Sequence, residues 1–434
     1  MKKLLLVTSV ILFACSLSFS QGNYDRLITN SNAEIVGISE ERINLLDDHI
    51  QKYIDNGTLP GGVFMVMRKG NVVYNKAFGQ KSMDGNDPYK KDDIFRLASM
   101  TKAVTTVSIM QLYEQGKLGL DDPIFYYIPE FAKPVVLEDY NAADTSYTSV
   151  PANKPITIRH LLTHTSGITY GAFNPGKIQA IYQKAGANAF GLSHMEMNTQ
   201  QMAAQIAKVP LIFHPGEKYM YGLNMEVLGR IVEVVSGESL AQYFKNHIFD
   251  PLGMKDTWFY QPKENHDRLV PVYAYNNQAK KLFVNPDPNL NYPNMEDPNH
   301  YAGGGGLSGT ANDYAIFIQA LVNGGIYKDA RILSRKTIEV MTSDQLLSLK
   351  AMGGGYSPLP GLTYGLGFQL KTKEGSALGH KSPGTYEWGG VFNTKFFIDP
   401  AENLTFVGMT QVLPFTRPDF WDRMYAIIYG SIED

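Results

Sequence analysis

The chain has 434 residues, a net charge of -3 and an apolar content of 44%, which is ordinary for a globular protein. No basic run is long enough to indicate nucleic acid or an anionic membrane as a partner, and we expect neither. Beyond the N-terminal segment, no stretch has the ~18 consecutive apolar residues that a membrane span needs. The sequence therefore predicts a globular body with no transmembrane segment in the mature chain.

The N-terminal segment is typical of a secretory signal. Two lysines precede a short apolar run, and small residues follow up to Ser20. This order predicts a signal peptide over residues 1–20, cut before Gln21, and hence an exported protein that is periplasmic or secreted. Cys15 leaves an alternative open, in which it is a lipid-attachment cysteine.

Cysteine content and the absence of linkers limit the remaining chain. Cys15 is the only cysteine, so a protein cut after Ser20 has no disulfide, no thiolate metal ligand and no cysteine nucleophile. No Gly/Ser, Pro-rich or charged tract separates two complete units, and no internal repeat is present. We therefore expect residues 21–434 to form one domain with a large insertion.

The first predicted elements are helices and a strand pair. Residues 39–56 have apolar side chains at helical spacing behind a capping serine. Residues 61–68 and 72–78 are typical of two paired strands joined by a tight turn. A further helix is predicted from Ser99 to Gly116, where the glycine ends the helical pattern.

The rest of the chain returns from helices to strands. Its middle part is mostly helices and long polar loops. The later predicted elements are helices at 226–236 and 240–248, strands at 365–371, 391–398 and 404–411, and a closing helix at 417–430. Strands at both ends with helices between them predict an α+β fold, in which helices and a mostly helical lobe flank one antiparallel sheet.

Ser99 and Lys102 form the first candidate for chemistry. Serine and lysine three residues apart at the start of a helix lie on one face, one turn apart. Unpaired N–H groups and the helix dipole there favour a developing negative charge, and a buried lysine can act as a base. Such a pair also arises by chance about once or twice in a chain of this length, and a capping serine needs no catalytic role.

The sequence around this pair resembles the nucleophile segment of class C β-lactamases, penicillin-binding proteins and family VIII carboxylesterases. The resemblance continues over nearly the whole mature chain. The segments that carry it are Asp93 to Lys102, Ile156 to Ile168, Pro215-Gly216, Pro251 to Met254, and the glycine run 303–306 followed by Leu307-Ser308. It implies a β-lactamase/transpeptidase-like fold and an acyl-enzyme formed on Ser99. His160 and His164 lie within these segments and are expected to hold loop structure.

The family's Tyr-x-Asn loop is matched by Tyr221-Gly222-Leu223. By resemblance, Tyr221 takes the proton of the nucleophile, as phenolate or through the lysine, and later delivers it to the leaving group. The nearby Tyr219 is a competing candidate. Leu223 stands where the family has asparagine, and Asn224 is one position off. This departure argues against an amide side chain that would hold a substrate's acylamino group.

The family's Lys-Thr-Gly or His-x-Gly triad aligns with Trp388-Gly389-Gly390. Glycines there let the backbone approach a substrate closely. By resemblance, the N–H groups of Val391 and Ser99 form an oxyanion hole. An indole at 388 supplies no cation for a substrate carboxylate, and neither Lys381 nor Lys395 can be assigned to the site from sequence.

The resemblance implies a serine hydrolase that needs no metal or organic cofactor. Its substrate is a small ester, amide or β-lactam, and esterase-like hydrolysis leads because the cation and the asparagine suited to anionic amides are absent. A β-lactamase or a D-amino-acid or DD-peptidase is the alternative within the family. A catalytically weak ligand-binding protein with the penicillin-binding fold is the alternative from another class. Oligomeric state is not predicted.

Overall fold

The computed structural model describes residues 26–29, 32–82, 85–141, 143–171, 177–187, 192, 195–276, 278–295, 300–347, 349 and 361–434. The predicted signal peptide at residues 1–20, including Cys15, lies outside the described residues. No helix within the described ranges is both long enough and apolar enough to cross a membrane.

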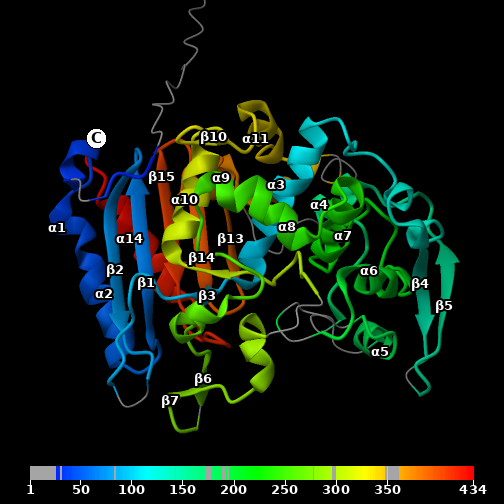
Figure 1. Cartoon of the computed structure of the whole chain (residues 1–434), viewed down its shortest axis with the longest axis horizontal. Helices are drawn as coiled ribbons and strands as arrows, with labels where there is room; N and C mark the ends of the chain where they lie inside the picture. Colours follow the sequence, from blue (N-terminus) through cyan, green and yellow to red (C-terminus); the bar gives the residue numbers. More distant parts are fainter. Residues whose placement is uncertain are drawn as a thin grey trace, which may run out of the picture.

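A seven-stranded antiparallel sheet forms the centre of the fold (Figure 1). As predicted, its strands come from both ends of the chain. In spatial order they are β11 (Leu362–Tyr364), β12 (Gln369–Lys371), β13 (Tyr386–Gly390), β14 (Thr394–Asp399), β15 (Leu404–Met409), β1 (Gly61–Arg68) and β2 (Asn71–Gly79). The N-terminal pair β1–β2 joins the C-terminal strands through β15, where Val63 pairs with Met409. Every residue of β1 is buried.

Helices cover both faces of the sheet because the strands bury apolar side chains on both faces. Along β1, Val63 and Met65 face one apolar core, and Phe64 and Val66 face the other. The first core holds α3 (Thr101–Glu114) and α10 (Ala311–Val322). The second holds α1 (Glu40–Ile43), α2 (Leu45–Asp55) and α14 (Asp419–Gly430), so the sheet lies between two helical layers.

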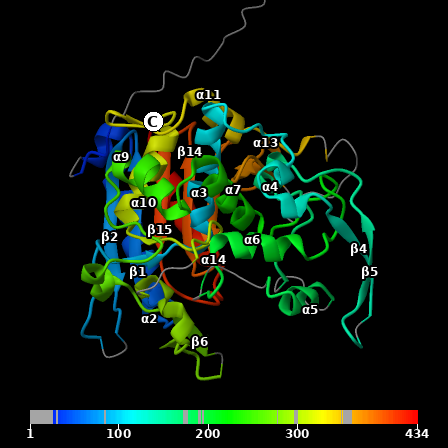
Figure 2. The same ribbon diagram turned by 45° about the vertical axis from the view of Figure 1, so that its right-hand side comes forward.

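A mostly helical lobe lies beside the α3 face of the sheet (Figure 2). It contains α4 (Ile158–Leu162), α5 (Lys177–Lys184), α6 (Thr199–Ala207), α7 (Asn224–Ser236) and the hairpin of β4 (Val135–Tyr140) and β5 (Tyr147–Pro151). Helix α7 packs against both α3 and α6. The contact between α3 and α7 joins the lobe to the sheet domain, and the candidate site lies at this junction.

Shorter elements complete the fold. The two-stranded pairs are β3 (Phe95–Arg96) with β8 (Ser308–Gly309), β6 (Tyr273–Asn276) with β7 (Lys281–Val284), and β9 (Ile326–Tyr327) with β10 (Ala330–Arg331). The short helices include α8 (Leu240–Phe244), which continues as the π-helix η6 (Lys245–Phe249), then α9 (Asp250–Leu252), α11 (Arg335–Met341) and α13 (Lys373–Ser376).

Two predicted boundaries differ from the structure next to the candidate site. The helix expected from Ser99 begins at Thr101, and Ser99 lies in the 3-10 turn η2 (Ala98–Met100) before it. The strand expected at 391–398 begins at Thr394, because Trp388 to Gly390 already belong to the preceding strand β13 and Val391 lies in the turn between the two strands.

Candidate active site

Ser99 lies in the η2 turn that leads into α3, next to the end of the inner strand β13. Ala98, just before it, has φ +47°, a value that non-glycine residues seldom adopt. The turn is held on both sides, since Leu97 N–H donates to Leu307 O (2.9 Å) and Tyr314 Oη donates to Met100 O (2.9 Å). These contacts fix a partly exposed serine hydroxyl against the junction with the lobe.

Lys102 follows one turn later and is completely buried. Its ammonium nitrogen donates to Ser99 Oγ at 3.1 Å, Tyr170 Oη at 3.2 Å and Gly304 O at 2.5 Å. An ammonium has three N–H donors, so these three acceptors satisfy it fully. Burial with full hydrogen bonding holds the lysine rigidly next to the serine.

Tyr221 approaches the serine from the lobe side. Its hydroxyl lies 2.8 Å from Ser99 Oγ, in hydrogen-bond contact, and its ring centroid lies 4.9 Å from Lys102 Nζ. The structure thus brings Ser99, Lys102 and Tyr221 together from η2, α3 and the segment before α7. The ring of the competing candidate Tyr219 packs instead against that of Tyr364 in a tilted arrangement, with 5.3 Å between the ring centroids.

Aromatic side chains from the sheet strands β13 and β11 lie beside this group. The indole of Trp388 is half-buried and lies 5.3 Å from the ring of Tyr221 and 5.6 Å from that of Tyr364. Tyr364 and Tyr219 pack with Leu346 and Leu349 in a small apolar cluster that Trp388 also contacts. The position aligned with the family's cation therefore carries an apolar surface with one N–H donor.

The end of β13 lies directly against the nucleophile turn. A methyl group on Gly390 would come within 2.5 Å of Leu97 O and 3.3 Å of Ala98 Cβ, so only glycine fits there. Val391 follows at once and is 39% exposed. This close approach brings the backbone of residues 390–391 next to the turn that carries Ser99.

Asn224 carries the side-chain amide nearest the Tyr-x-Asn position, and this amide forms its hydrogen bonds within the lobe. It is fully buried, accepts from Ser166 Oγ at 2.5 Å and lies 2.8 Å from His164 Nδ1. Leu223, at the family's asparagine position, is buried as well. His164 holds this loop as expected, and burial together with the Lys102 ammonium keeps the pKa of His164 well below its usual range. No amide from this loop is therefore available to a substrate.

Comparisons with known proteins cover most of the chain. The sequence profile described as Beta-lactamase matches residues 46–429. The chain is 30% identical to the lovastatin esterase of Penicillium rubens over 85% of this chain and 93% of that protein. It is 27% identical to a putative D-alanyl-D-alanine carboxypeptidase of Escherichia coli K12, and the match covers 94% of this chain and 90% of that protein. It also resembles the structure of EstCE1, a hydrolase with promiscuous acyltransferase activity, with a TM-score of 0.76, 27% identity and coverage of 90% and 99%.

The chain belongs to the beta-lactamase family. It has the β-lactamase/transpeptidase-like fold expected from its sequence, and it is a serine hydrolase of that family.

The two lysines that the sequence left unassigned lie on the opposite face of the sheet from the serine. Lys395 pairs across the strands with Gly389, whereas Phe396 pairs with Trp388. Because side chains alternate along a strand, Lys395 points away from the face that carries Trp388. Lys381 forms an ion pair with Glu387 and lies 3.8 Å from the ring centroid of Tyr425 on α14. In this member of the beta-lactamase family, neither lysine therefore places a positive charge beside Trp388 to bind a substrate carboxylate.

The site of this beta-lactamase-family chain also contains residues that the sequence analysis missed. Tyr170 bonds to Lys102, and burial raises the pKa of its hydroxyl well above the usual range, with Tyr221 and Glu226 adding to the effect. Gly304 supplies the third acceptor for Lys102. Tyr170 comes just after the noted segment 156–168, and Gly304 lies within the noted glycine run 303–306. A linear pattern does not show which atoms of these segments face the lysine.

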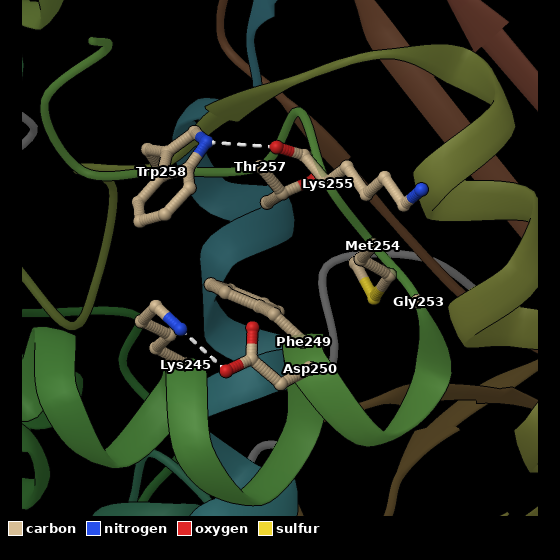
Figure 3. Close-up of a pocket in the computed structure, with 8 residues that line it drawn as sticks. All are labelled: Lys245, Phe249, Asp250, Gly253, Met254, Lys255, Thr257 and Trp258. Carbon is tan, nitrogen blue, oxygen red and sulfur yellow. Dashed lines mark hydrogen bonds and ion pairs between the residues drawn. The ribbon is translucent and has the colours of Figure 1, made fainter.

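A separate surface pocket of about 350 Å³ lies away from this site (Figure 3). Its lining comes from η6, α9 and the loop after them: Lys245, Phe249, Asp250, Gly253, Met254, Lys255, Thr257 and Trp258. The Lys245–Asp250 ion pair lies on one side of it, and the Trp258 indole donates to Lys255 O on the other. None of the family's site residues contributes to this pocket. Within the described residues, no cluster of His, Cys, Asp or Glu is arranged to hold a metal ion.

Proposed function

We propose that this chain hydrolyses small neutral esters through an acyl-enzyme on Ser99. One observation carries the proposal: Ser99 Oγ is in hydrogen-bond contact with both Lys102 Nζ at 3.1 Å and Tyr221 Oη at 2.8 Å. A serine becomes a useful nucleophile when an adjacent group can take its proton. A protein that only binds ligands has no need of this arrangement, which argues against the weak-binder alternative.

The proposed reaction has two halves. Ser99 Oγ attacks the ester carbonyl carbon while its proton passes to the unprotonated member of the Lys102–Tyr221 pair, either a neutral lysine amine or a tyrosine phenolate. The tetrahedral intermediate then collapses, the C–O bond to the alcohol breaks, and the pair returns the proton to the leaving oxygen. Water repeats the sequence on the acyl-enzyme and releases the acid with Ser99 restored.

We propose the backbone N–H groups of Ser99 and Val391 as the oxyanion hole. Gly390 supports this assignment because its close approach to Leu97 O brings the end of β13 against the nucleophile turn. N–H donors at such a position stabilise the charge that develops on the carbonyl oxygen, and losing one typically costs about 10²–10³ in rate. Gly389 and Gly390 leave room for a substrate beside the strand.

Three features favour neutral esters over β-lactams or D-Ala-D-Ala peptides. Trp388 replaces the cation that would bind a substrate carboxylate, and Lys381 and Lys395 belong to the other face of the sheet. The amide of Asn224 is held by Ser166 and His164. The side chains around Tyr221 are aromatic, which suits neutral acyl and alcohol groups.

A substrate panel tests the proposed function. The purified protein is assayed with short p-nitrophenyl esters, nitrocefin and D-Ala-D-Ala peptides, and the values of kcat/KM are compared. We expect the esters to have the highest values. Faster turnover of nitrocefin or of the peptides would replace the esterase preference with the β-lactamase or peptidase alternative and would leave the Ser99 chemistry in place.

Trp388→Lys is expected to narrow the gap between neutral and anionic substrates. A charge-assisted hydrogen bond to a carboxylate contributes ~1.5–3 kcal/mol, or about one to two decades in affinity or rate. The gain should appear mainly for penicillins and D-Ala-D-Ala peptides, measured as kcat/KM on the same panel. Trp388→Leu removes the indole without adding charge and serves as the matched control. If kcat/KM for the anionic substrates rose equally in Trp388→Lys and Trp388→Leu, the size of the side chain and not its charge would determine the preference for neutral esters.

We also propose that the chain is exported with cleavage before Gln21. The full-length protein with a C-terminal tag should be recovered outside the cytoplasm, and N-terminal sequencing should begin at Gln21, because residues 1–20 have the features of a cleaved signal. Radioactive lipid that labels the protein and disappears in Cys15→Ala would show instead that Cys15 is the anchor.

A further inference from the structure

A buried carboxylate lies behind Lys102 and is connected to it through one glycine. Glu226 on α7 is 1% exposed, and its Oε1 accepts the N–H of Gly304 at 2.9 Å. The carbonyl of the same glycine accepts Lys102 Nζ at 2.5 Å. The chain of contacts therefore runs from the Glu226 carboxylate through Gly304 to the ammonium that contacts Ser99.

The start of the glycine run is packed tightly between α7 and Lys102. A methyl group on Gly304 would lie 2.6 Å from Glu226 Oε1 and 3.4 Å from Lys102 Nζ. A methyl group on Gly303 would lie 2.5 Å from the carbonyl oxygen of Met225. Glycine at 303 lets the backbone approach α7, and glycine at 304 lets it approach the carboxylate and the ammonium. The position of the Gly304 carbonyl therefore depends on where Glu226 holds the Gly304 N–H.

Four groups face the Glu226 carboxylate. The Lys102 ammonium on α3 attracts it, and the N–H groups of Gly303 and Gly304 donate to it. His300 Nε2 lies 3.7 Å from Glu226 Oε2, and burial lowers the pKa of His300 to about 4, so this imidazole is neutral at pH 7. Burial raises the pKa of Glu226 to about 7 against the opposing effect of Lys102 and the two N–H groups. Tyr170 is close enough that Glu226 contributes to its raised pKa.

We infer that Glu226 is a positioning residue for acylation, which fixes the Gly303–Gly304 backbone that holds Lys102 against Ser99 and sets by its charge the pH range in which Ser99 is activated. The inference rests on the proposed function. A negative carboxylate attracts the positive charge at Lys102 and so opposes loss of a proton from the Lys102–Tyr221 pair as a whole. Removing that charge makes a proton acceptor for Ser99 available at lower pH, whichever of the two groups is the base.

The rate of Ser99 labelling by a small neutral fluorophosphonate measures this effect directly. The labelling rate is measured from about pH 5 to about pH 9 in the wild type and in Glu226→Gln. This range brackets the Glu226 pKa of about 7. Glutamine keeps an acceptor for the Gly304 N–H but carries no charge. We expect the rising limb of the labelling profile to move to lower pH by about one unit, the shift that a nearby charge typically produces.

Asp313→Asn is the matched control. Asp313 on α10 is also a buried carboxylate, and burial raises its pKa to about 6. It accepts from the N–H of Asp256 at 2.8 Å and from Thr257 Oγ1 at 2.9 Å. Its neutralisation should leave the shape of the labelling profile unchanged. An equal shift in both variants would assign the effect to a general change in charge and overturn the inference.

Glu226→Asp tests the positioning role independently and serves if the glutamine variant does not fold. It keeps the charge but is one methylene shorter, so we expect labelling to slow by about 10- to 100-fold, as when a catalytic group is misplaced. Wild-type rates in this variant, or a glutamine profile that coincides with wild type, would overturn the inference. A wild-type protein that the probe does not label at Ser99 would instead overturn the proposed function itself.

Discussion

Ser99→Ala is expected to abolish both turnover and covalent labelling while the fold persists. Loss of the nucleophile removes the acyl-enzyme route, so esterase activity should fall by at least about a thousandfold. The hydroxyl contacts Lys102 and Tyr221 at the surface of the junction and packs no core, so circular dichroism and the Tm should stay close to wild type. A fluorophosphonate followed by mass spectrometry of the intact protein measures the labelling.

Ser108→Ala is the control for this substitution. Ser108 lies on the same helix α3, where its hydroxyl donates to Val104 O at 3.1 Å. It takes no part in the group around Ser99, so labelling and turnover should be retained. A Ser99→Ala protein that keeps more than about a tenth of wild-type turnover would disprove the assignment, since a lost nucleophile costs far more.

Lys102→Ala and Tyr221→Phe should each slow acylation by about a thousandfold, and the double variant should be little slower than either single one. Groups that transfer one proton as a unit are strongly non-additive, and both side chains contact the same oxygen, Ser99 Oγ. Single-turnover kinetics with a p-nitrophenyl ester measure the acylation step in all three variants.

Tyr219→Phe separates the two candidate tyrosines. Tyr219 packs against Tyr364, and the ring that makes this contact survives the substitution, so acylation should fall far less than in Tyr221→Phe. Losses from Lys102→Ala and Tyr221→Phe that add fully in the double variant would mean that the two groups act in separate steps.

Local patterns were enough to predict β1, β2 and β15 and to single out three candidate site residues, but the strand expected at 365–371 spans the gap between β11 and β12, and β13 was not predicted. Alternating or continuous apolar runs defined β1, β2 and β15 to within two residues, and order along the chain indicated that both ends contribute to one sheet. Ser99, Lys102 and Tyr221 became candidates because each lies in a short segment whose spacing resembles that of the family. The contacts among them then follow from the packing of α3 against α7.

The remaining features depend on contacts between distant segments. Glu226 lies in the first turn of a helix, where an acidic residue is ordinarily exposed and favourable to the helix dipole, so nothing in the pattern indicates that it is buried. Val391 has a strong strand propensity, yet it lies in a turn because Asn393 adopts φ +68° and reverses the chain. Tyr170 belongs to the site only because its hydroxyl accepts a hydrogen bond from Lys102, a contact that the sequence pattern does not show.

The pairing of β1 with β15 has a consequence for how the chain folds. The partners Val63 and Met409 lie near opposite ends of the sequence, and the last residue, Asp434, forms ion pairs with Arg68 and Lys69 at the end of β1. A nascent chain in which β15 has not yet emerged from the ribosome therefore lacks one partner of its first long strand. Pairing between segments so far apart in the sequence makes formation of the sheet slow and postpones it until β15 has been synthesised.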